Sequence, residues 1–193
     1  MAKCYDGKAT AGEEALSRQA LEARLAQALA QAKQPCEIRQ TTLCYMERDG
    51  QYLMLHRVSK AHDASHGKWI GIGGKCERDE SPDECMVREV REETGLVVRQ
   101  WRYRGIVTFI SDVWPCEYMH LFTTHDWGGE QARHCDEGVL RWVDKQDVLN
   151  LPLWEGDKVF LRLLMDEQHP FFSLKLVYRG DALEQVVLDG RRQ

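Results

Sequence analysis

The feature that most constrains this chain is a run of charged residues, REVREE, at positions 88–93. In a helix of about 3.6 residues per turn, this run places Glu89, Glu92 and Glu93 on one face. Three carboxylates so close together repel one another and destabilise an isolated helix. Divalent cations relieve that repulsion, and Mg²⁺ and Mn²⁺ prefer oxygen ligands. The bare pattern is also typical of a solvated acidic helix face, so its surroundings must decide between the two interpretations.

The surroundings predict a strand, a glycine loop and a capped helix. A short apolar stretch over 69–72 ends in Gly73 and Gly74. Ser81 and Pro82 predict the start of a helix, because serine can accept hydrogen bonds from the first turn and proline costs none there. Gly95 predicts its end. The glutamates are therefore expected on a helix that follows a glycine loop.

The spacing across 74–96 resembles the Nudix box, G-x5-E-x7-R-E-U-x-E-E-x-G-U, in which U is aliphatic. Gly74, Glu80, the run at 88–93, Gly95 and Leu96 match it without a gap. Seven specified residues at ordinary frequencies give a chance match at one start a probability below roughly 10⁻⁸. The chain thus resembles the Nudix hydrolases. This implies an α+β Nudix fold, a mixed β-sheet sandwiched between helices (α/β/α), with an N-terminal helical extension in this chain.

The resemblance implies a role for the residues of the box. Glu89, Glu92 and Glu93 are expected to bind Mg²⁺, or Mn²⁺ in its place, together with the backbone carbonyl of Gly73. Arg88 is expected to orient the glutamates. Bound Mg²⁺ would supply the positive potential that an acidic chain lacks, and would activate a water molecule for attack on a diphosphate.

The resemblance also implies roles for further acidic residues. Glu137 is expected to complete the metal site from a loop outside the box, with its neighbour Asp136 as a rival. Glu80 is expected to be a structural part of the box loop. Either Glu89 or Glu92 could be the general base, since family members differ in this respect.

The resemblance runs from about Thr41 to Asp189 and is greatest to MutT-type enzymes, which hydrolyse oxidised purine nucleoside triphosphates such as 8-oxo-dGTP. It implies that Trp154 stacks on the base and that Asp157 hydrogen-bonds its edge. Ile70 departs from the animal enzymes of this branch, which have an asparagine that reads the purine. Recognition of the 8-oxo group is therefore open.

Arg57 and Lys75 are candidate phosphate contacts. The expected activity is hydrolysis of 8-oxo-dGTP, or another non-standard purine nucleotide, to the monophosphate and pyrophosphate. Two alternatives stay open: another nucleoside diphosphate conjugate, such as ADP-ribose or a dinucleotide polyphosphate, as substrate, or a nucleotide-sensing domain without catalysis.

Composition limits which partners and which cellular compartment are expected for this chain. Lys and Arg number 26 against 31 Asp and Glu, giving a net charge of −5, so a nucleic-acid polymer is not expected as partner. No apolar run approaches the roughly 18 residues of a membrane span. The seven cysteines include no C-x-x-C pair, and the histidines lack the spacing of a zinc site. A reduced, cytoplasmic protein with a small-molecule nucleotide substrate is expected.

Helix formers over 11–33 predict one helix within an N-terminal extension at 1–38, which could mediate a homodimer, before a hydrolase domain at 39–193. Within that domain, the Asp49-Gly50 turn signal predicts a hairpin between 38–46 and 52–58. The other elements expected from residue type are strands over 101–110, 117–124 and 139–143, a helix over 155–165, and a hairpin of 171–178 with 184–188.

Overall fold

The computed structural model describes residues 22–23, 38–59 and 64–193. The chain divides into two units, Met1–Cys36 and Glu37–Gln193, and the fold below is that of the second. In the first, residues 22–23 are helical. The rest of the helix expected over 11–33, and the dimer contact expected through it, lie outside the described residues. Within the described part, no helix is both long and apolar enough to cross a membrane.

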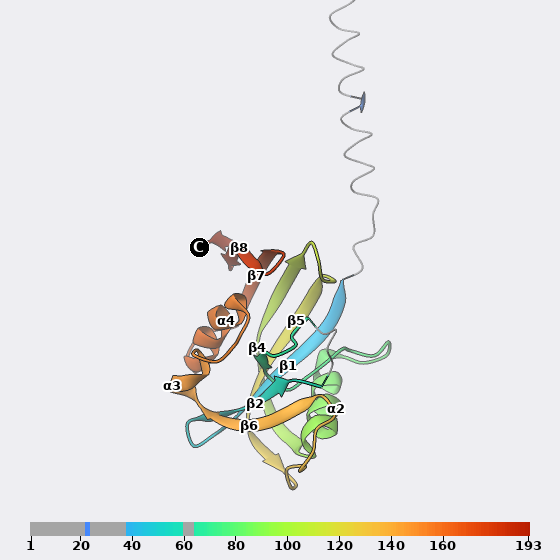
Figure 1. The fold of residues 1–193 in the computed structure, drawn as a ribbon, viewed down its shortest axis with the longest axis vertical. Helices are drawn as coiled ribbons and strands as arrows, with labels where there is room; N and C mark the ends of the chain where they lie inside the picture. The colour runs from blue at the N-terminus through green and yellow to red at the C-terminus, as the bar shows by residue number, and fades with distance from the viewer. Residues whose placement is uncertain (1–21, 24–37, 60–63) are drawn as a thin grey trace, which may run out of the picture. The chain divides into compact units, whose positions relative to one another are not determined.

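The elements follow one another in a mixed order of strands and helices (Figure 1). They are β1 (Arg39–Arg48), β2 (Gln51–Arg57), β3 (Trp69–Ile70), α2 (Pro82–Thr94), β4 (Val97–Ser111), β5 (Glu117–Gly128), β6 (Gly138–Asp144), α3 (Lys145–Val148), α4 (Glu155–Met165), β7 (Phe172–Arg179), β8 (Ala182–Leu188) and β9 (Arg191–Arg192).

The strands form one mixed sheet. β1 lies parallel to β5, β5 is antiparallel to β4, and β4 is parallel to β7, which continues into β8 and β9. On the other side of β1, β2 pairs with both β3 and β6. β1 and β2 pair with each other only beside their turn, where Glu47 faces Tyr52 and Arg48 faces Gln51. The expected hairpin is therefore present but short, because residues 72–75 pair with the rest of this edge of β1, as in the Cys44–Ile72 and Thr41–Lys75 bridges.

The turn between β1 and β2 has the backbone that its sequence predicts. Asp49 and Gly50 both have positive φ, 52° and 75°, as a two-residue hairpin turn of type I′ requires. β4 is longer than expected, since register shifts between Val98 and Gly105 let it bend and continue along β5.

Both faces of the sheet are apolar, because β1 and β2 alternate between two cores. Cys44 and Met46 pack with α2, whereas Tyr45 between them packs with α4. The helices α2 and α4 accordingly lie on opposite sides of the sheet (Figure 1). The expected α+β fold, a mixed sheet between helices, is confirmed.

The helix α2 has the ends that its sequence predicts. The Ser81 side chain accepts a hydrogen bond from the Glu84 N–H at 3.2 Å, and the Glu84 side chain accepts one from the Ser81 N–H at 2.8 Å. Such a capping interaction stabilises a helix by about 1 kcal/mol. Gly95 ends the helix with a φ of 73°. Both ends fix the position of the glutamates between them.

Candidate active site

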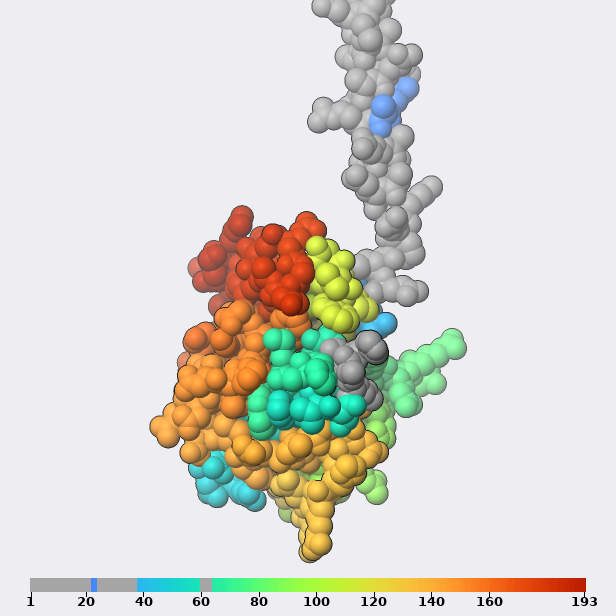
Figure 2. Space-filling model, viewed as in Figure 1, coloured from blue at the N-terminus to red at the C-terminus, as the bar shows by residue number. Residues whose placement is uncertain are grey.

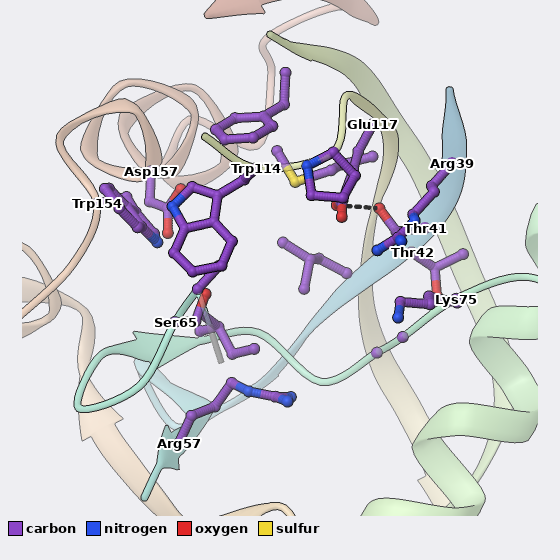
Figure 3. A pocket seen from close by; sticks show the side chains of 18 of the residues that line it. Arg39, Thr41, Thr42, Arg57, Ser65, Lys75, Trp114, Glu117, Trp154 and Asp157 are labelled. Carbon is purple, nitrogen blue, oxygen red and sulfur yellow. Dashed lines mark hydrogen bonds between the residues drawn. The ribbon is translucent and has the colours of Figure 1, made fainter. Parts of the chain in front are cut away.

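A cavity of about 670 Å³ opens between the sheet and the segments around it. Its lining residues come from β1, the loop between β3 and α2, α2 itself, the turn between β4 and β5, α4 and β7. Several of these segments are far apart in sequence and lie side by side on the face shown in Figure 2. In Figure 3, Trp154 and Asp157 lie on one side of the cavity and Lys75 on the other.

Two glycines bring the chain close to the glutamates of α2. A side chain at Gly73 would collide with the carbonyl oxygen of Thr42, and the Gly73 N–H donates to Glu93 Oε2 at 3.1 Å. A Cβ at Gly74 would lie 2.6 Å from the Glu89 carboxylate. Glycine at position 73 is therefore required by the backbone of β1, and glycine at position 74 leaves room for the Glu89 carboxylate.

Two of the box glutamates line the cavity, where burial disfavours the ionised form of their carboxyl groups. Glu93 is only 6% exposed, and burial raises its pKa to about 8, although the Gly73 N–H opposes the shift. Burial also raises the pKa of Glu89, against the lowering effect of Arg88. A cation placed between these carboxylates would stabilise their ionised form.

Arg88 links the loop to the helix. Its guanidinium donates to both oxygens of Glu80, at 2.6 and 2.9 Å, and to Glu89 Oε1 at 2.8 Å. Hydrogen bonding from Arg88 lowers the pKa of Glu80 to about 2. A further hydrogen bond of 3.1 Å reaches Glu92, whose side chain is 60% exposed and does not line the cavity. The structure therefore places Glu89 and Glu93 in the cavity and Glu92 beside it.

The segment before β6 brings a third carboxylate to the cavity. Glu137 lines the cavity and forms an ion pair of 2.6 Å with Arg57, which also lines it. The pairing of β2 with β6 sets this contact, since Arg57 and Gly138 are register partners. Asp136, the rival of Glu137, has a 98% exposed side chain that pairs with His134 at 3.1 Å.

The opposite side of the cavity is aromatic and contains one buried acid. The Trp154 ring meets Tyr178 edge to face at 5.4 Å, and Lys68 lies 4.4 Å from the Trp154 ring centre. Asp157 is 7% exposed, and burial raises its pKa to about 7. The N–H of Gly156 donates to the Tyr178 hydroxyl at 2.7 Å, which fixes the start of α4 against β7.

Sequence reasoning missed several cavity residues. Arg39, Glu117 and Thr41 lie where β1 and β5 begin, and Thr41 donates to Glu117 at 3.3 Å. Trp114 lines the cavity from the turn between β4 and β5 (Figure 3). These residues come together only through the parallel pairing of β1 with β5, for which the sequence carries no local signal.

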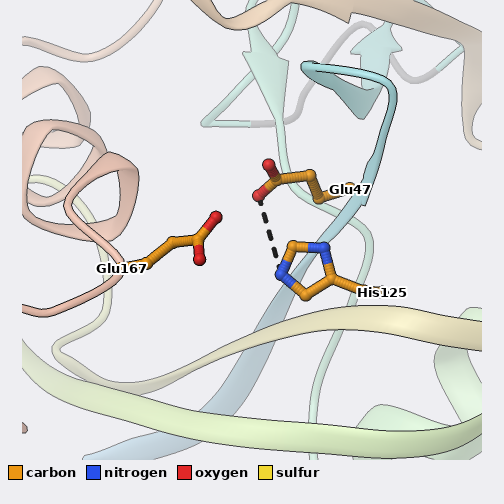
Figure 4. Close-up of side chains that lie close together, drawn as sticks. All are labelled: Glu47, His125 and Glu167. Carbon is orange, nitrogen blue, oxygen red and sulfur yellow. Dashed lines mark ion pairs between the residues drawn. The ribbon is translucent and has the colours of Figure 1, made fainter.

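A second group of possible metal ligands lies outside this cavity. Donor atoms of Glu47, His125 and Glu167 lie within 4.8 Å of one another (Figure 4). Glu47 also pairs with the Lys145 ammonium, which already supplies a positive charge there. None of these four residues lines the cavity.

Comparison with known proteins identifies a family whose sequence pattern this chain matches. The sequence pattern of the NUDIX domain matches residues 38–164. The chain is 32% identical over 135 residues to YvcI, an uncharacterized Nudix hydrolase of Bacillus subtilis, covering 68% of this chain and 82% of YvcI. It is 32% identical over 122 residues to the CTP pyrophosphohydrolase of Escherichia coli, covering 62% of this chain and 86% of that protein.

Other similar proteins point in the same direction. The oxidized purine nucleoside triphosphate hydrolase of Danio rerio is 30% identical over 104 residues, which cover 53% of this chain and 65% of that protein. The crystal structure of a MutT mutator protein from Bacillus halodurans superposes with a TM-score of 0.69 at 27% identity, covering 79% of this chain and 98% of that one.

Proposed function

This chain belongs to the Nudix family of hydrolases, and from that premise we propose that it cleaves a diphosphate bond in an oxidised or otherwise non-standard purine nucleoside triphosphate. The products would be a nucleoside monophosphate, such as 8-oxo-dGMP from 8-oxo-dGTP, and pyrophosphate. One observation carries the proposal: a single cavity joins three acidic side chains and Lys75 to an aromatic wall with a buried acid. Its volume of about 670 Å³ is within the usual range for a ligand of this size.

The acidic side of the cavity suits a hard divalent cation. Glu89, Glu93 and Glu137 offer oxygen donors, and burial raises the pKa of Glu93 although the Gly73 N–H and the charge of Arg57 oppose the shift. We assign these three, with the Gly73 carbonyl, to Mg²⁺, with Mn²⁺ as a substitute. Glu92, whose side chain lies beside the cavity, remains a further candidate ligand for Mg²⁺. Bound Mg²⁺ would neutralise charge on the phosphoryl oxygens and lower the pKa of an attacking water.

The chain's own residues then have several tasks, and Glu89, already assigned to Mg²⁺, has two. Glu89 lies in the cavity wall and is our candidate for the base that takes the proton from the attacking water, whereas the exposed Glu92 is the weaker candidate. Arg88 keeps Glu89 in place through its hydrogen bonds to Glu80 and Glu89. Lys75 and Arg57 line the cavity beside the carboxylates and are the candidate contacts to the phosphates.

The aromatic side suits a nucleobase. Trp154 offers a large apolar surface beside Asp157, whose carboxylate can accept a hydrogen bond from the edge of a base. The Danio rerio relative supports a purine, and the Escherichia coli relative acts on CTP. Purine preference is therefore a matter for direct measurement.

A substrate panel tests the proposal. Initial rates with Mg²⁺ are measured for 8-oxo-dGTP, dGTP, dATP, CTP, ADP-ribose and diadenosine tetraphosphate, and the products are identified. Monophosphate and pyrophosphate, formed most efficiently from 8-oxo-dGTP, are the expected result. A preference for ADP-ribose or the dinucleotide would contradict it. Tight nucleotide binding without turnover of any compound would instead indicate a sensing domain.

A further inference from the structure

Trp114 is a cavity residue to which the resemblance gives no role. It lies in the turn between β4 and β5, and its indole nitrogen is buried without a hydrogen-bond partner among the described residues. Such a group is rare in folded proteins, because a buried N–H that has lost its water and gained no partner costs free energy. A ligand acceptor within the cavity would remove that cost.

The turn that carries Trp114 is held in place by its neighbours. The Ser111 hydroxyl accepts hydrogen bonds from the N–H groups of Val113, at 3.1 Å, and Trp114, at 3.0 Å. Asp112 accepts one from the Gly180 N–H at 2.9 Å, which ties the turn to the β7–β8 hairpin. The backbone that carries the indole is therefore held in place, which favours specific recognition by its N–H.

Asp157 supplies the complementary group. Its carboxylate lines the same cavity, is 7% exposed, and accepts no hydrogen bond from the described residues. In Figure 3 the indole of Trp114 lies over the cavity with its nitrogen edge on the side of Asp157. The aromatic side of the cavity thus has one donor and one acceptor, neither of which has a hydrogen-bond partner among the described residues.

We propose that Trp114 is a specificity residue that reads the nucleobase together with Asp157: the indole N–H donates to a base carbonyl oxygen, and the carboxylate accepts from the adjacent ring N–H. The pair would recognise a lactam, O=C–N–H, as in hypoxanthine, guanine and its 8-oxo form. A carbonyl oxygen has two lone pairs and accepts over a broad range of directions, whereas a ring nitrogen such as N1 of adenine has one. This inference rests on the proposed function, which assigns this side of the cavity to the base.

Two substrates that differ only in this edge test the inference. Deoxyinosine triphosphate (dITP) has the lactam, and dATP has an amino group and an unprotonated N1 in its place. Trp114→Phe removes the N–H and keeps an aromatic ring. We expect it to lower kcat/KM for dITP about tenfold, mainly through KM, and to change dATP less than about twofold. Trp101→Phe is the matched control, since Trp101 is partly exposed and its N–H already donates to Asp83 at 2.7 Å.

Equal losses on both substrates would show a packing role for Trp114 and overturn the inference, as would an unchanged rate with dITP. A binding measurement separates this result from a failure of the proposed function. The ¹H–¹⁵N indole signal of Trp114, assigned by its absence in Trp114→Phe, is followed while dIMP or dAMP is added. A downfield shift with dIMP alone supports the inference even if no triphosphate is hydrolysed. No shift, or no binding of dIMP, contradicts it.

Discussion

The carboxylate of Glu89 lies directly against the backbone of Gly74, so that even a methyl group at position 74 would come within 2.6 Å of it. Gly74→Ala should therefore displace Glu89 while leaving the cores untouched. We expect kcat to fall about 100-fold, as for other small displacements of a reacting group. Initial rates and thermal unfolding of the same preparations check this. Wild-type turnover by a folded Gly74→Ala protein would remove Glu89 from the reaction.

Metal binding should be visible without any substrate. Mg²⁺ that binds only the folded protein raises its unfolding temperature. We expect this rise in the wild type and its loss in Glu93→Gln, which keeps the shape of the buried side chain but not its charge. Glu184→Gln, whose side chain is exposed on β8, is the matched control and should respond to Mg²⁺ like the wild type. An unchanged response of Glu93→Gln to Mg²⁺ would exclude Glu93 as a ligand.

Arg88 should not be replaceable by lysine. Its guanidinium donates at once to Glu80, to Glu89 and to the carbonyl oxygen of Lys75, which a single ammonium cannot reproduce. Arg88→Lys is expected to reduce kcat about 100-fold. Saturation with Mg²⁺ should not restore it, because the defect is one of orientation. Full recovery at high Mg²⁺ would instead assign Arg88 to metal affinity.

The two candidate bases can be separated by comparing equivalent substitutions. Glu89→Gln and Glu92→Gln remove one charge each from the same helix, but only Glu89 lies in the cavity wall. We expect both to lower turnover, since Glu92 is expected from the family to assist the metal. Glu89→Gln should be the slower by about tenfold or more, as is typical for loss of a general base. The opposite order would assign the base to Glu92.

Asp157 should make stability depend on pH. Its pKa is raised to about 7 by burial, so the folded protein retains a proton that the unfolded chain releases near pH 4. The unfolding free energy should therefore fall as pH rises from about 4 to about 7, by about 1.4 kcal/mol per pH unit. Tyr45 and Tyr178, which interact electrostatically with Asp157, have raised pKa values and stay neutral there, and Lys68 partly offsets the effect.

Asp157→Asn removes this titration. Relative to the wild type, its unfolding free energy should increase by about 2 kcal/mol between pH 5.5 and pH 8. Urea unfolding at both pH values measures the difference, and any constant cost of the new amide cancels. Parallel pH profiles of the two proteins would contradict the raised pKa of this buried carboxyl group.

The sequence predicted best where the signal is local. The ends of α2 follow from Ser81 and Gly95, and the turn of β1 into β2 follows from Asp49 and Gly50, because each depends on a few adjacent residues. Gly73 and Gly74 lie in the loop between β3 and α2, as expected for a glycine loop between a strand and a helix. The exposure of the Glu92 side chain was not predicted. Helical periodicity shows that Glu89, Glu92 and Glu93 share one face of the helix, but not which of them the neighbouring segments bury.

Long-range pairing accounts for what the sequence did not predict. Trp114 and Glu117 reach the cavity because β5 pairs in parallel with β1 and β4 continues alongside it. Neither residue belongs to a periodic pattern: Trp114 lies in the short turn between β4 and β5, and Glu117 is the first residue of β5. Likewise, Glu47, His125 and Glu167 come together from β1, β5 and the loop after α4, although no spacing between them suggested a group.

The pairing of β2 with β6 has a consequence for the chemistry of the cavity. A side chain at Gly138 would collide with the carbonyl oxygen of His56, so this glycine fits only where it lies opposite Arg57. A slip of one residue would turn every side chain of β6 to the opposite face. Gly138 therefore fixes the register of β6 against β2. Backbone clearance between two strands, rather than any property of the acids themselves, selects Glu137 over Asp136 to face the cavity.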